Sequence, residues 1–216
     1  MKKTLLTALV AASVLSAAVA VAQTGKPKPT TATYITKEEI DLVSKSQQTK
    51  AVDDENTKVV DLGYENFTLG VIHRGSTRNP APPAAGGNAG AAAAPAESCG
   101  RQMAALPPGG TPGGIVHDFQ TEGYYIVSGG GTMFTDGYIV NGRHNNQDPA
   151  GGPNGPTCGG MAYAVKNVAV KVGDVVIVPP GVVHGWADIP DHVDYLSFRP
   201  SQHVMQPGWV NPTIAK

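Results

Sequence analysis

The sequence predicts an all-β protein, a sandwich or barrel of short strands with one short N-terminal helix and two long loops rich in glycine and proline. The 216 residues include 27 glycines and 18 prolines, about a fifth of the chain, which favours turns over long helices. Only 15% of the residues are charged, whereas a helical bundle or coiled coil needs long charged stretches. Valine-rich runs recur at close spacing with turn residues between them, as in sandwiches and barrels.

Residues 1–22 have the pattern of a secretory signal peptide. Two lysines precede a run of small apolar residues, and Ala20-Val21-Ala22 fits the small-x-small cleavage motif. A membrane anchor is the alternative, but the run is short and rich in alanine for a bilayer span. No later stretch is apolar enough to cross a membrane, so we expect an exported mature chain without a membrane span, in the periplasm or outside the cell.

The charge balance argues against one class of partner. Lysine and arginine number 16 and aspartate and glutamate 17, which gives a formal net charge of −1. Nucleic-acid-binding domains carry a basic excess or a basic stripe instead. We therefore expect no nucleic-acid partner.

Export gives the two cysteines, Cys99 and Cys158, a meaning that they would not have in the cytoplasm. In an oxidising compartment a disulfide between them is the default expectation. Such a bridge closes a loop of roughly 60 residues and stabilises by about 4 kcal/mol in the chain-entropy model. Free thiols and metal ligation stay open as alternatives, although neither cysteine has a neighbouring histidine as zinc sites usually do.

The N-terminal part of the mature chain, residues 23–57, is predicted to hold a polar lead-in and the one short helix. Thr36 and Glu39 have the spacing of a capping box, in which each side chain bonds to the backbone amide of the other. We therefore expect a helix over about residues 37–48.

A single β domain is predicted over residues 58–205, with a C-terminal tail over 206–216. Residues 76–114 and 137–161 are crowded with glycine, proline and alanine, and they are predicted as loops because they have little apolar surface to bury. The run Ser128-Gly129-Gly130-Gly131 is predicted as a hairpin turn between two strands. The expected strands cover residues 58–62, 65–74, 123–127, 132–134, 162–172, 174–178, 182–187 and 193–198.

Two groups of residues with regular spacing lie about 50 positions apart. The first is His117, Glu122 and Gly129, and the second is Gly173, Pro179, Gly181 and His184. This pair of motifs resembles the cupin superfamily, whose first motif is His-x-His, three or four residues, Glu, six residues, Gly. The second cupin motif is Gly, five residues, Pro-x-Gly, two residues, His, three residues, Asn; Asp188 stands where the Asn is usual. The resemblance spans about residues 65–200 and implies an antiparallel β-barrel or jelly roll, often dimeric, with the ligand site inside.

The resemblance implies a metal site that departs from the family pattern at one position. Ile115 stands where the first histidine of His-x-His is usual, so the matching ligands are His117, Glu122 and His184. Two imidazoles and a carboxylate with open positions suit one divalent ion such as Fe or Mn and tolerate Zn. A degenerate site, in which the same side chains are only hydrogen-bonded, is the alternative. His73 could replace the missing ligand if its strand turns that face inward.

Alternation along the strands predicts the surroundings of this site. Glu122 shares a face with Tyr124 and Ile126, and His184 shares one with Val182 and Trp186, so these residues are expected to line an apolar pocket. Glu122 and Tyr124 are the candidate catalytic groups, with the phenol as proton donor or substrate-positioning group. The alternative for Tyr124 is a core aromatic with a bonded hydroxyl.

Several functions remain compatible with a cupin-like metal site, because fold does not fix function. The first hypothesis is a metal-dependent enzyme, a dioxygenase-like oxidoreductase acting on a small oxygenated organic molecule, with isomerase or lyase chemistry also open. The second is a noncatalytic protein of the cell envelope that binds a small sugar, acid or phenolic compound. The missing histidine and the long loops favour the second, and the open coordination positions beside aromatic side chains favour the first.

Overall fold

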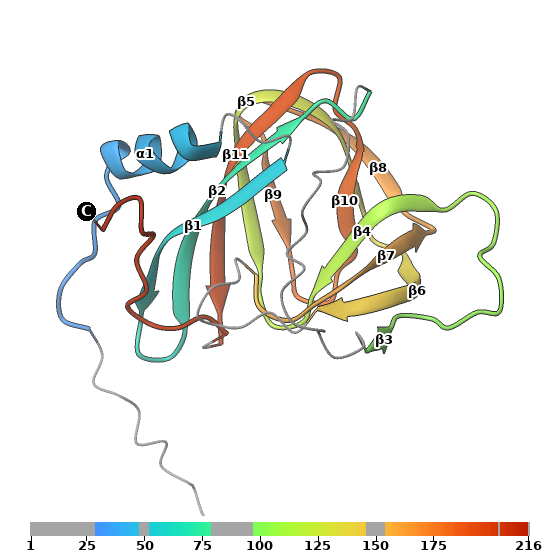
Figure 1. The fold of residues 1–216 in the computed structure, drawn as a ribbon, viewed down its shortest axis with the longest axis horizontal. Helices are drawn as coiled ribbons and strands as arrows, with labels where there is room; N and C mark the ends of the chain where they lie inside the picture. Colours follow the sequence, from blue (N-terminus) through green and yellow to red (C-terminus); the bar gives the residue numbers. More distant parts are fainter. Residues whose placement is uncertain (1–28, 48–51, 79–96, 146–153, 203, 216) are drawn as a thin grey trace, which may run out of the picture.

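The structure, a computed structural model, describes residues 29–47, 52–78, 97–145, 154–202 and 204–215 (Figure 1). The predicted signal peptide, residues 1–22, lies outside these ranges, as do parts of both predicted loops. The described residues form one helix and eleven strands, which confirms the all-β class with a short helix. The elements are α1 (Lys37–Gln47), β1 (Val52–Asp61), β2 (Asn66–Gly75), β3 (Ser98–Cys99), β4 (Thr111–His117), β5 (Glu122–Thr135), β6 (Tyr138–Asn145), β7 (Thr157–Tyr163), β8 (Lys166–Lys171), β9 (Val175–Val178), β10 (His184–Asp188) and β11 (His192–Ser201).

The strands pair antiparallel in the order β1-β2-β11-β5-β10-β4-β7-β6-β3, with β8 and β9 also paired to β5. Strand β5 joins the two halves of the molecule that Figure 1 shows. Its residues 122–129 pair with β9 and β11, and its residues 130–135 pair with β8 and β10. The closed barrel or jelly roll that the resemblance implies stays a prediction.

The hairpin predicted at residues 128–131 is wrong, because β5 runs unbroken through this glycine run. Gly129 has a φ of 64°, which changes the strand's direction without reversing it. A Cβ at Gly129 would lie 2.0 Å from the carbonyl oxygen of His192, and one at Gly131 would lie 2.4 Å from that of Asp188. The glycines therefore permit neighbouring backbone to approach β5 where it passes from one half to the other.

Both predicted loops contain more strand than their composition indicated. Segment 76–114 includes β3 and the start of β4, and segment 137–161 includes β6 and the start of β7. These strands could not be predicted from the sequence, because glycines remove the alternation of apolar and polar side chains that marks a strand. The glycines also permit close packing: a Cβ at Gly160 would lie 2.9 Å from the Cα of Gly142.

The helix prediction is confirmed, with α1 ending one residue before the expected limit. Its capping box forms, since the Glu39 amide donates to Thr36 Oγ1 at 3.3 Å and the Thr36 amide donates to Glu39 Oε2 at 3.0 Å. Gln47 is buried and donates from Nε2 to the Val71 carbonyl at 2.7 Å, which attaches the end of α1 to β2. Figure 1 shows α1 beside β1 and β2.

The C-terminal segment returns to β1, whose first half has no apolar alternation. The Val59 amide donates to the Trp209 carbonyl at 2.9 Å, and the Asn211 amide donates to the Thr57 carbonyl at 2.8 Å. Strand β1 begins at Val52, six residues before the first predicted strand. Its inward side chains Asp54 and Asn56 are polar, because they belong to a buried ionic network described below.

The predicted disulfide is confirmed between Cys99 on β3 and Cys158 on β7, with a Cα–Cα separation of 5.9 Å. A disulfide is typical of proteins in a non-reducing, exported environment. None of the helices in the described part of the chain has the length and apolar character needed to cross a membrane.

Reduction of the disulfide is expected to lower the free energy of unfolding by about 4 kcal/mol, because it frees a 59-residue loop in the unfolded chain. For a chain of this size the thermal midpoint should fall by roughly 10 °C. Calorimetry with and without a reductant measures this. A Cys99→Ser/Cys158→Ser variant is the control, because its midpoint should be low and insensitive to the reductant. Two alkylatable thiols in native, unreduced protein would contradict the prediction.

Candidate metal centre

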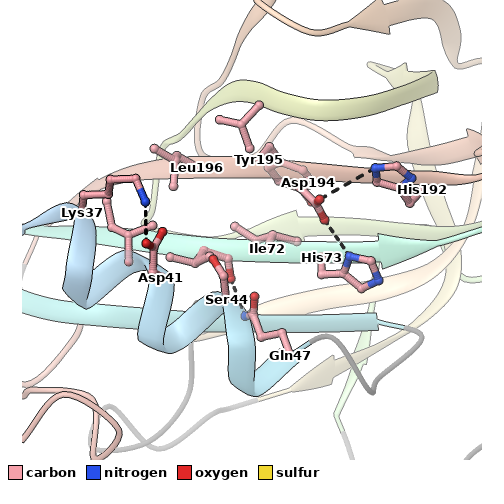
Figure 2. Close-up of a pocket in the computed structure, with 13 residues that line it drawn as sticks. Lys37, Asp41, Ser44, Gln47, Ile72, His73, His192, Asp194, Tyr195 and Leu196 are labelled. Atoms are coloured by element: carbon pink, nitrogen blue, oxygen red, sulfur yellow. Dashed lines mark hydrogen bonds and ion pairs between the residues drawn. The ribbon is translucent and has the colours of Figure 1, made fainter.

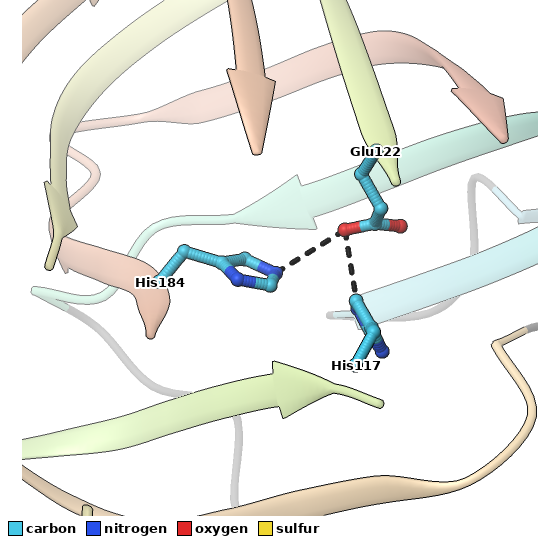
Figure 3. Close-up of side chains that lie close together, drawn as sticks. All are labelled: His117, Glu122 and His184. Carbon is cyan, nitrogen blue, oxygen red and sulfur yellow. Dashed lines mark ion pairs between the residues drawn. The ribbon is translucent and has the colours of Figure 1, made fainter. Parts of the chain in front are cut away.

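Three side chains from three strands converge in the interior between the two halves of the molecule (Figure 3). His117 ends β4, Glu122 begins β5 and His184 begins β10. One ligand atom from each lies within 4.8 Å of the other two. The Nε2 atoms of His117 and His184 are each 3.2 Å from Glu122 Oε2, and the three side chains are 2–3% exposed.

The backbone of the second motif brings His184 to the other two residues. A turn forms where the Val182 amide donates to the Pro179 carbonyl at 3.2 Å, and the Gly181 amide donates to the His117 carbonyl at 2.9 Å. The turn is therefore bonded directly to the end of β4. His184 then pairs with Ile115 of β4 and Thr135 of β5.

The tautomer of His184 follows from its backbone contact. Its Nδ1 lies 3.1 Å from the Val182 carbonyl, and a carbonyl oxygen only accepts, so Nδ1 carries the proton. The Nε2 lone pair therefore faces Glu122. This is the arrangement in which a second contact orients a histidine ligand.

The unsatisfied polar atoms of the group fit a metal ion. Among the described residues, neither ring nitrogen of His117 has a hydrogen-bond partner, and His184 Nε2 has none either, although both Nε2 atoms lie near Glu122. A buried polar atom without a partner is costly, and a metal ion would use one ring lone pair from each histidine. Burial lowers the pKa of His117, which favours the neutral imidazole that a metal needs.

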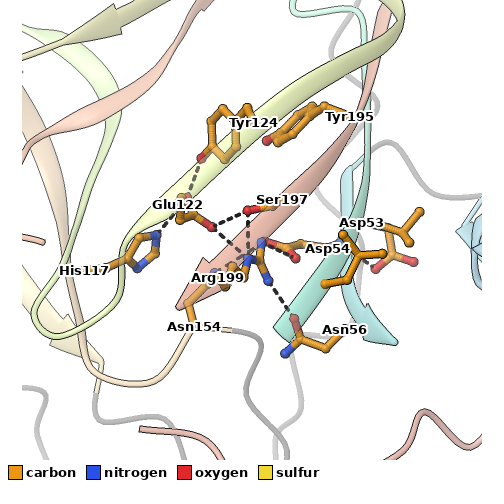
Figure 4. Close-up of polar contacts among 12 residues, drawn as sticks. Asp53, Asp54, Asn56, His117, Glu122, Tyr124, Asn154, Tyr195, Ser197 and Arg199 are labelled. Atoms are coloured by element: carbon orange, nitrogen blue, oxygen red, sulfur yellow. Dashed lines mark hydrogen bonds and ion pairs between the residues drawn. The ribbon is translucent and has the colours of Figure 1, made fainter. Parts of the chain in front are cut away.

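A buried arginine supports the carboxylate from the opposite side (Figure 4). Arg199 on β11 is fully buried, and its Nε lies 3.0 Å from Glu122 Oε1. Its Nη2 donates to both oxygens of Asp54 at 2.8 Å, and its Nη1 donates to Asn56 Oδ1 at 2.9 Å. Burial acts to raise the pKa of Glu122, but the charge of Arg199 opposes it, and the pKa is held well below its usual range.

The two oxygens of Glu122 thus have different surroundings. Oε1 faces Arg199 and accepts from Ser197 Oγ at 3.3 Å, whereas Oε2 faces the two histidines. Oε2 is therefore the carboxylate oxygen that lies with the two Nε2 atoms and would serve as a ligand for a metal ion. Arg199 and Ser197 fix the plane of the carboxylate and keep it ionised.

Tyr124 lies at the same carboxylate, and its hydroxyl donates to Glu122 Oε2. Burial and the negative charge of Glu122 raise the pKa of Tyr124 well above its usual value, so the phenol keeps its proton. The ring also packs against Tyr195, with centroids 4.4 Å apart. The residue is therefore a core aromatic with a bonded hydroxyl, and its proton points at the candidate metal ligand.

A cavity of about 50 Å³ adjoins the group. The structure places Tyr124 and Trp186 on its wall, and it places Ile126 and Val182 in the apolar cluster beside it rather than on the wall. The remaining lining is more polar than the sequence predicted, because it includes charged and amide side chains from β1, β2 and the start of the segment before β7. The lining consists of Asp54, Arg74, Gly113, Ile115, Glu122, Tyr124, Asn154, His184, Gly185 and Trp186.

His73 does not join the group. It lies on the outer side of β2, where its Nδ1 is 2.6 Å from Asp194 Oδ1, in a separate pocket between α1 and the sheet (Figure 2). Its neighbour Arg74 lines the inner cavity instead, as alternation along a strand requires.

Metal affinity is therefore expected to be unchanged in His73→Ala, which removes a side chain bonded to Asp194. Ile115→His should instead tighten binding by about tenfold or more, the equivalent of about 1.4 kcal/mol, because Ile115 lines the cavity beside His184 and could supply a fourth ligand. Competition of each variant with a colorimetric chelator measures the two affinities. A large loss of metal in His73→Ala, or an unchanged affinity in Ile115→His, would contradict this geometry.

Arg199, Asp54 and Asn56 were not predicted as site residues from the sequence. A signal was present in β11, where Val193, Tyr195, Ser197 and Arg199 alternate and all four are buried, so the arginine shares the inward face. An arginine in phase with a buried apolar face needs a buried counter-charge. The location of that counter-charge, on a polar strand more than 140 residues earlier, had no sequence signal.

Neither the models of protein families nor the sequences of curated proteins give a match for this chain. Among solved structures, the comparison finds a weak similarity to the crystal structure of Peruvianin-I, a cysteine peptidase from Thevetia peruviana latex. That similarity has a TM-score of 0.34 and 11% sequence identity, over 81% of this chain and 77% of that one. A similarity at this level carries no argument about fold or function.

Proposed function

We propose that this protein is an exported metal-dependent enzyme of the cupin type, with one divalent Fe, Mn or Zn ion held by His117, Glu122 and His184. The observation that supports this most is the convergence of three buried ligand atoms within 4.8 Å, two of them imidazole nitrogens without a hydrogen-bond partner. The two cupin-like motifs meet at this point, and the predicted signal peptide and the disulfide agree with export.

The proposed reaction is dioxygenase-like: dioxygen is the oxidant, and a small oxygenated organic molecule at the ion is oxidised while dioxygen is reduced and its oxygen atoms enter the product. A three-ligand ion leaves positions open for exogenous ligands and polarises an oxygen bound there. Arg199 keeps Glu122 ionised. The Tyr124 hydroxyl donates to Glu122 Oε2 and keeps its proton, so its role in this reaction is to position the carboxylate beside the cavity.

A noncatalytic binding protein is the second candidate, and the small size of the cavity favours it. A volume of about 50 Å³ accommodates a ligand of few atoms and leaves little room for two reactants. The alternative predicts a protein that retains a small molecule without converting it.

Elemental analysis of protein purified from its own compartment tests the proposal. The expected result is one equivalent of Fe, Mn or Zn per chain, lost with activity on chelation and restored with it on reloading. Protein that binds its small molecule equally well without metal would support the binding candidate instead. Protein that takes up no divalent ion from buffer would overturn both the metal site and the enzyme.

A further inference from the structure

The charged side chains around the cavity balance before a metal ion is added. They are two carboxylates and two guanidinium groups, from Asp54, Glu122, Arg74 and Arg199. Asp53 and Glu55 occupy the alternate positions of β1, and Asp53 lies opposite His73 in the β1–β2 register, on the outer side. Ligand histidines are neutral. The function proposed above adds a bound divalent ion to this balanced set. The site then carries two positive charges that no described residue of the wall compensates.

Arg74 supplies the groups that would receive a compensating anion. Its guanidinium lines the cavity, and within the described residues its one hydrogen bond runs from Nε to Tyr195 Oη at 2.9 Å. Among the described residues no hydrogen bond is found for its two terminal nitrogens, so they are available to a ligand in the cavity that Arg74 lines. A guanidinium fork of this kind matches a carboxylate with two parallel hydrogen bonds.

The cavity limits the size of that anion. One water needs roughly 10–15 Å³ of such space, so about 50 Å³ holds roughly three to five non-hydrogen atoms. Formate and acetate fall within this limit, whereas an aromatic acid exceeds it. Ile115 contributes no ligand atom to the same wall, so the ion keeps a position for an oxygen of the anion.

We infer that the metal-loaded site takes a small carboxylate anion of three or four non-hydrogen atoms, held between the ion and the terminal nitrogens of Arg74. This inference rests on the proposed metal site and names its substrate class. Inorganic anions of the same size, such as nitrite, share this chemistry and are compared in the test.

The mature protein loaded with one equivalent of Co(II) provides the test, because its visible spectrum reports changes in coordination. Formate is expected to change the spectrum in a saturable way. Benzoate, which is too large, and formamide, which is neutral with the same shape, are expected to leave it unchanged. Arg74→Met should weaken formate binding by about ten- to a hundredfold, the range for hydrogen bonds to charged groups, and Arg74→Lys should weaken it less.

Arg101→Gln is the matched control, since Arg101 is exposed and lies over the Tyr138 ring at 3.5 Å; it should bind formate as the native protein does. Circular dichroism and the cobalt stoichiometry show whether each variant folds and loads. A native protein that takes up no cobalt would overturn the proposed function. A cobalt-loaded protein that ignores formate, binds formamide or benzoate equally well, or binds formate unchanged in Arg74→Met would overturn the carboxylate inference alone. Binding of nitrite without formate would do the same.

Discussion

Arg199→Met is expected to destabilise the folded, metal-free protein by about 3–5 kcal/mol, the usual effect of removing one member of a buried ionic group. The variant keeps most of the side-chain volume but leaves Glu122 and Asp54 without the guanidinium that lies 2.8–3.0 Å from their oxygens. Arg199→Lys keeps the positive charge and loses the guanidinium fork. Its free energy of unfolding should therefore lie between those of the native protein and Arg199→Met. Urea unfolding in the presence of EDTA measures the free energies.

Arg78→Met is the matched control for this prediction. Arg78 also pairs with a carboxylate, Asp188, at 2.7 Å, but their side chains are 61% and 37% exposed. Exposed ion pairs contribute little because water and salt screen them. Equal losses in Arg78→Met and Arg199→Met would contradict the importance of the buried network.

The loss in Arg199→Met should depend on pH in a defined direction. In the native protein the pKa of Glu122 is held below its unfolded value, so this group stabilises the fold above about pH 4.3 and its contribution is lost as the pH falls further. Without Arg199, burial raises the pKa of the same carboxyl above its unfolded value. Protonation of Glu122 then stabilises the folded variant. The difference in unfolding free energy between the two proteins should therefore shrink as the pH falls below about 5.

Sequence analysis predicted the elements whose side chains alternate or cap, and it failed where glycine or polar residues occupy strands. The helix was predictable because Thr36 and Glu39 bond locally. The unbroken β5 was not, because a glycine run has the same composition whether it turns back or only bends. Whether Gly129 ends a strand depends on the approach of the His192 backbone, which is a tertiary contact.

The candidate site also contains some residues that the sequence predicts and others that it does not. His117, Glu122 and His184 were predictable because the spacing of a strand end, a bend and a Pro-Pro-Gly turn is encoded within short segments. The placement of His73 depended on which face of β2 turns inward, and a shift of one residue would reverse it. The Arg199 network joins β11 to β1 across 145 positions, and no local pattern specifies such a pairing.

Loss of any one of the three candidate ligands is expected to lower metal affinity by more than the about 10–100-fold that removal of an outer contact costs. His117→Ala and His184→Ala each remove a nitrogen donor from a group whose ligand atoms lie within 4.8 Å. Glu122→Gln is the sharper variant, because it keeps the shape of the side chain and removes its charge. In that variant Arg199 keeps Asp54 as its partner, at 2.8 Å, so the protein should still fold.

Thermal unfolding with added metal measures this difference in one experiment. At a free metal concentration of 100 times the dissociation constant, the free energy of unfolding of the native protein should rise by about 2.7 kcal/mol. The free energies of unfolding of the three variants should rise little at the same concentration. His144→Ala is the control, because His144 is bonded to Asp118 at 2.7 Å and lies outside the group. Since His144 offers the same imidazole at a half-buried position, its variant should respond to metal as the native protein does. If all three ligand variants gain as much as the native protein, the two histidines and the glutamate are structural, and the metal binds elsewhere.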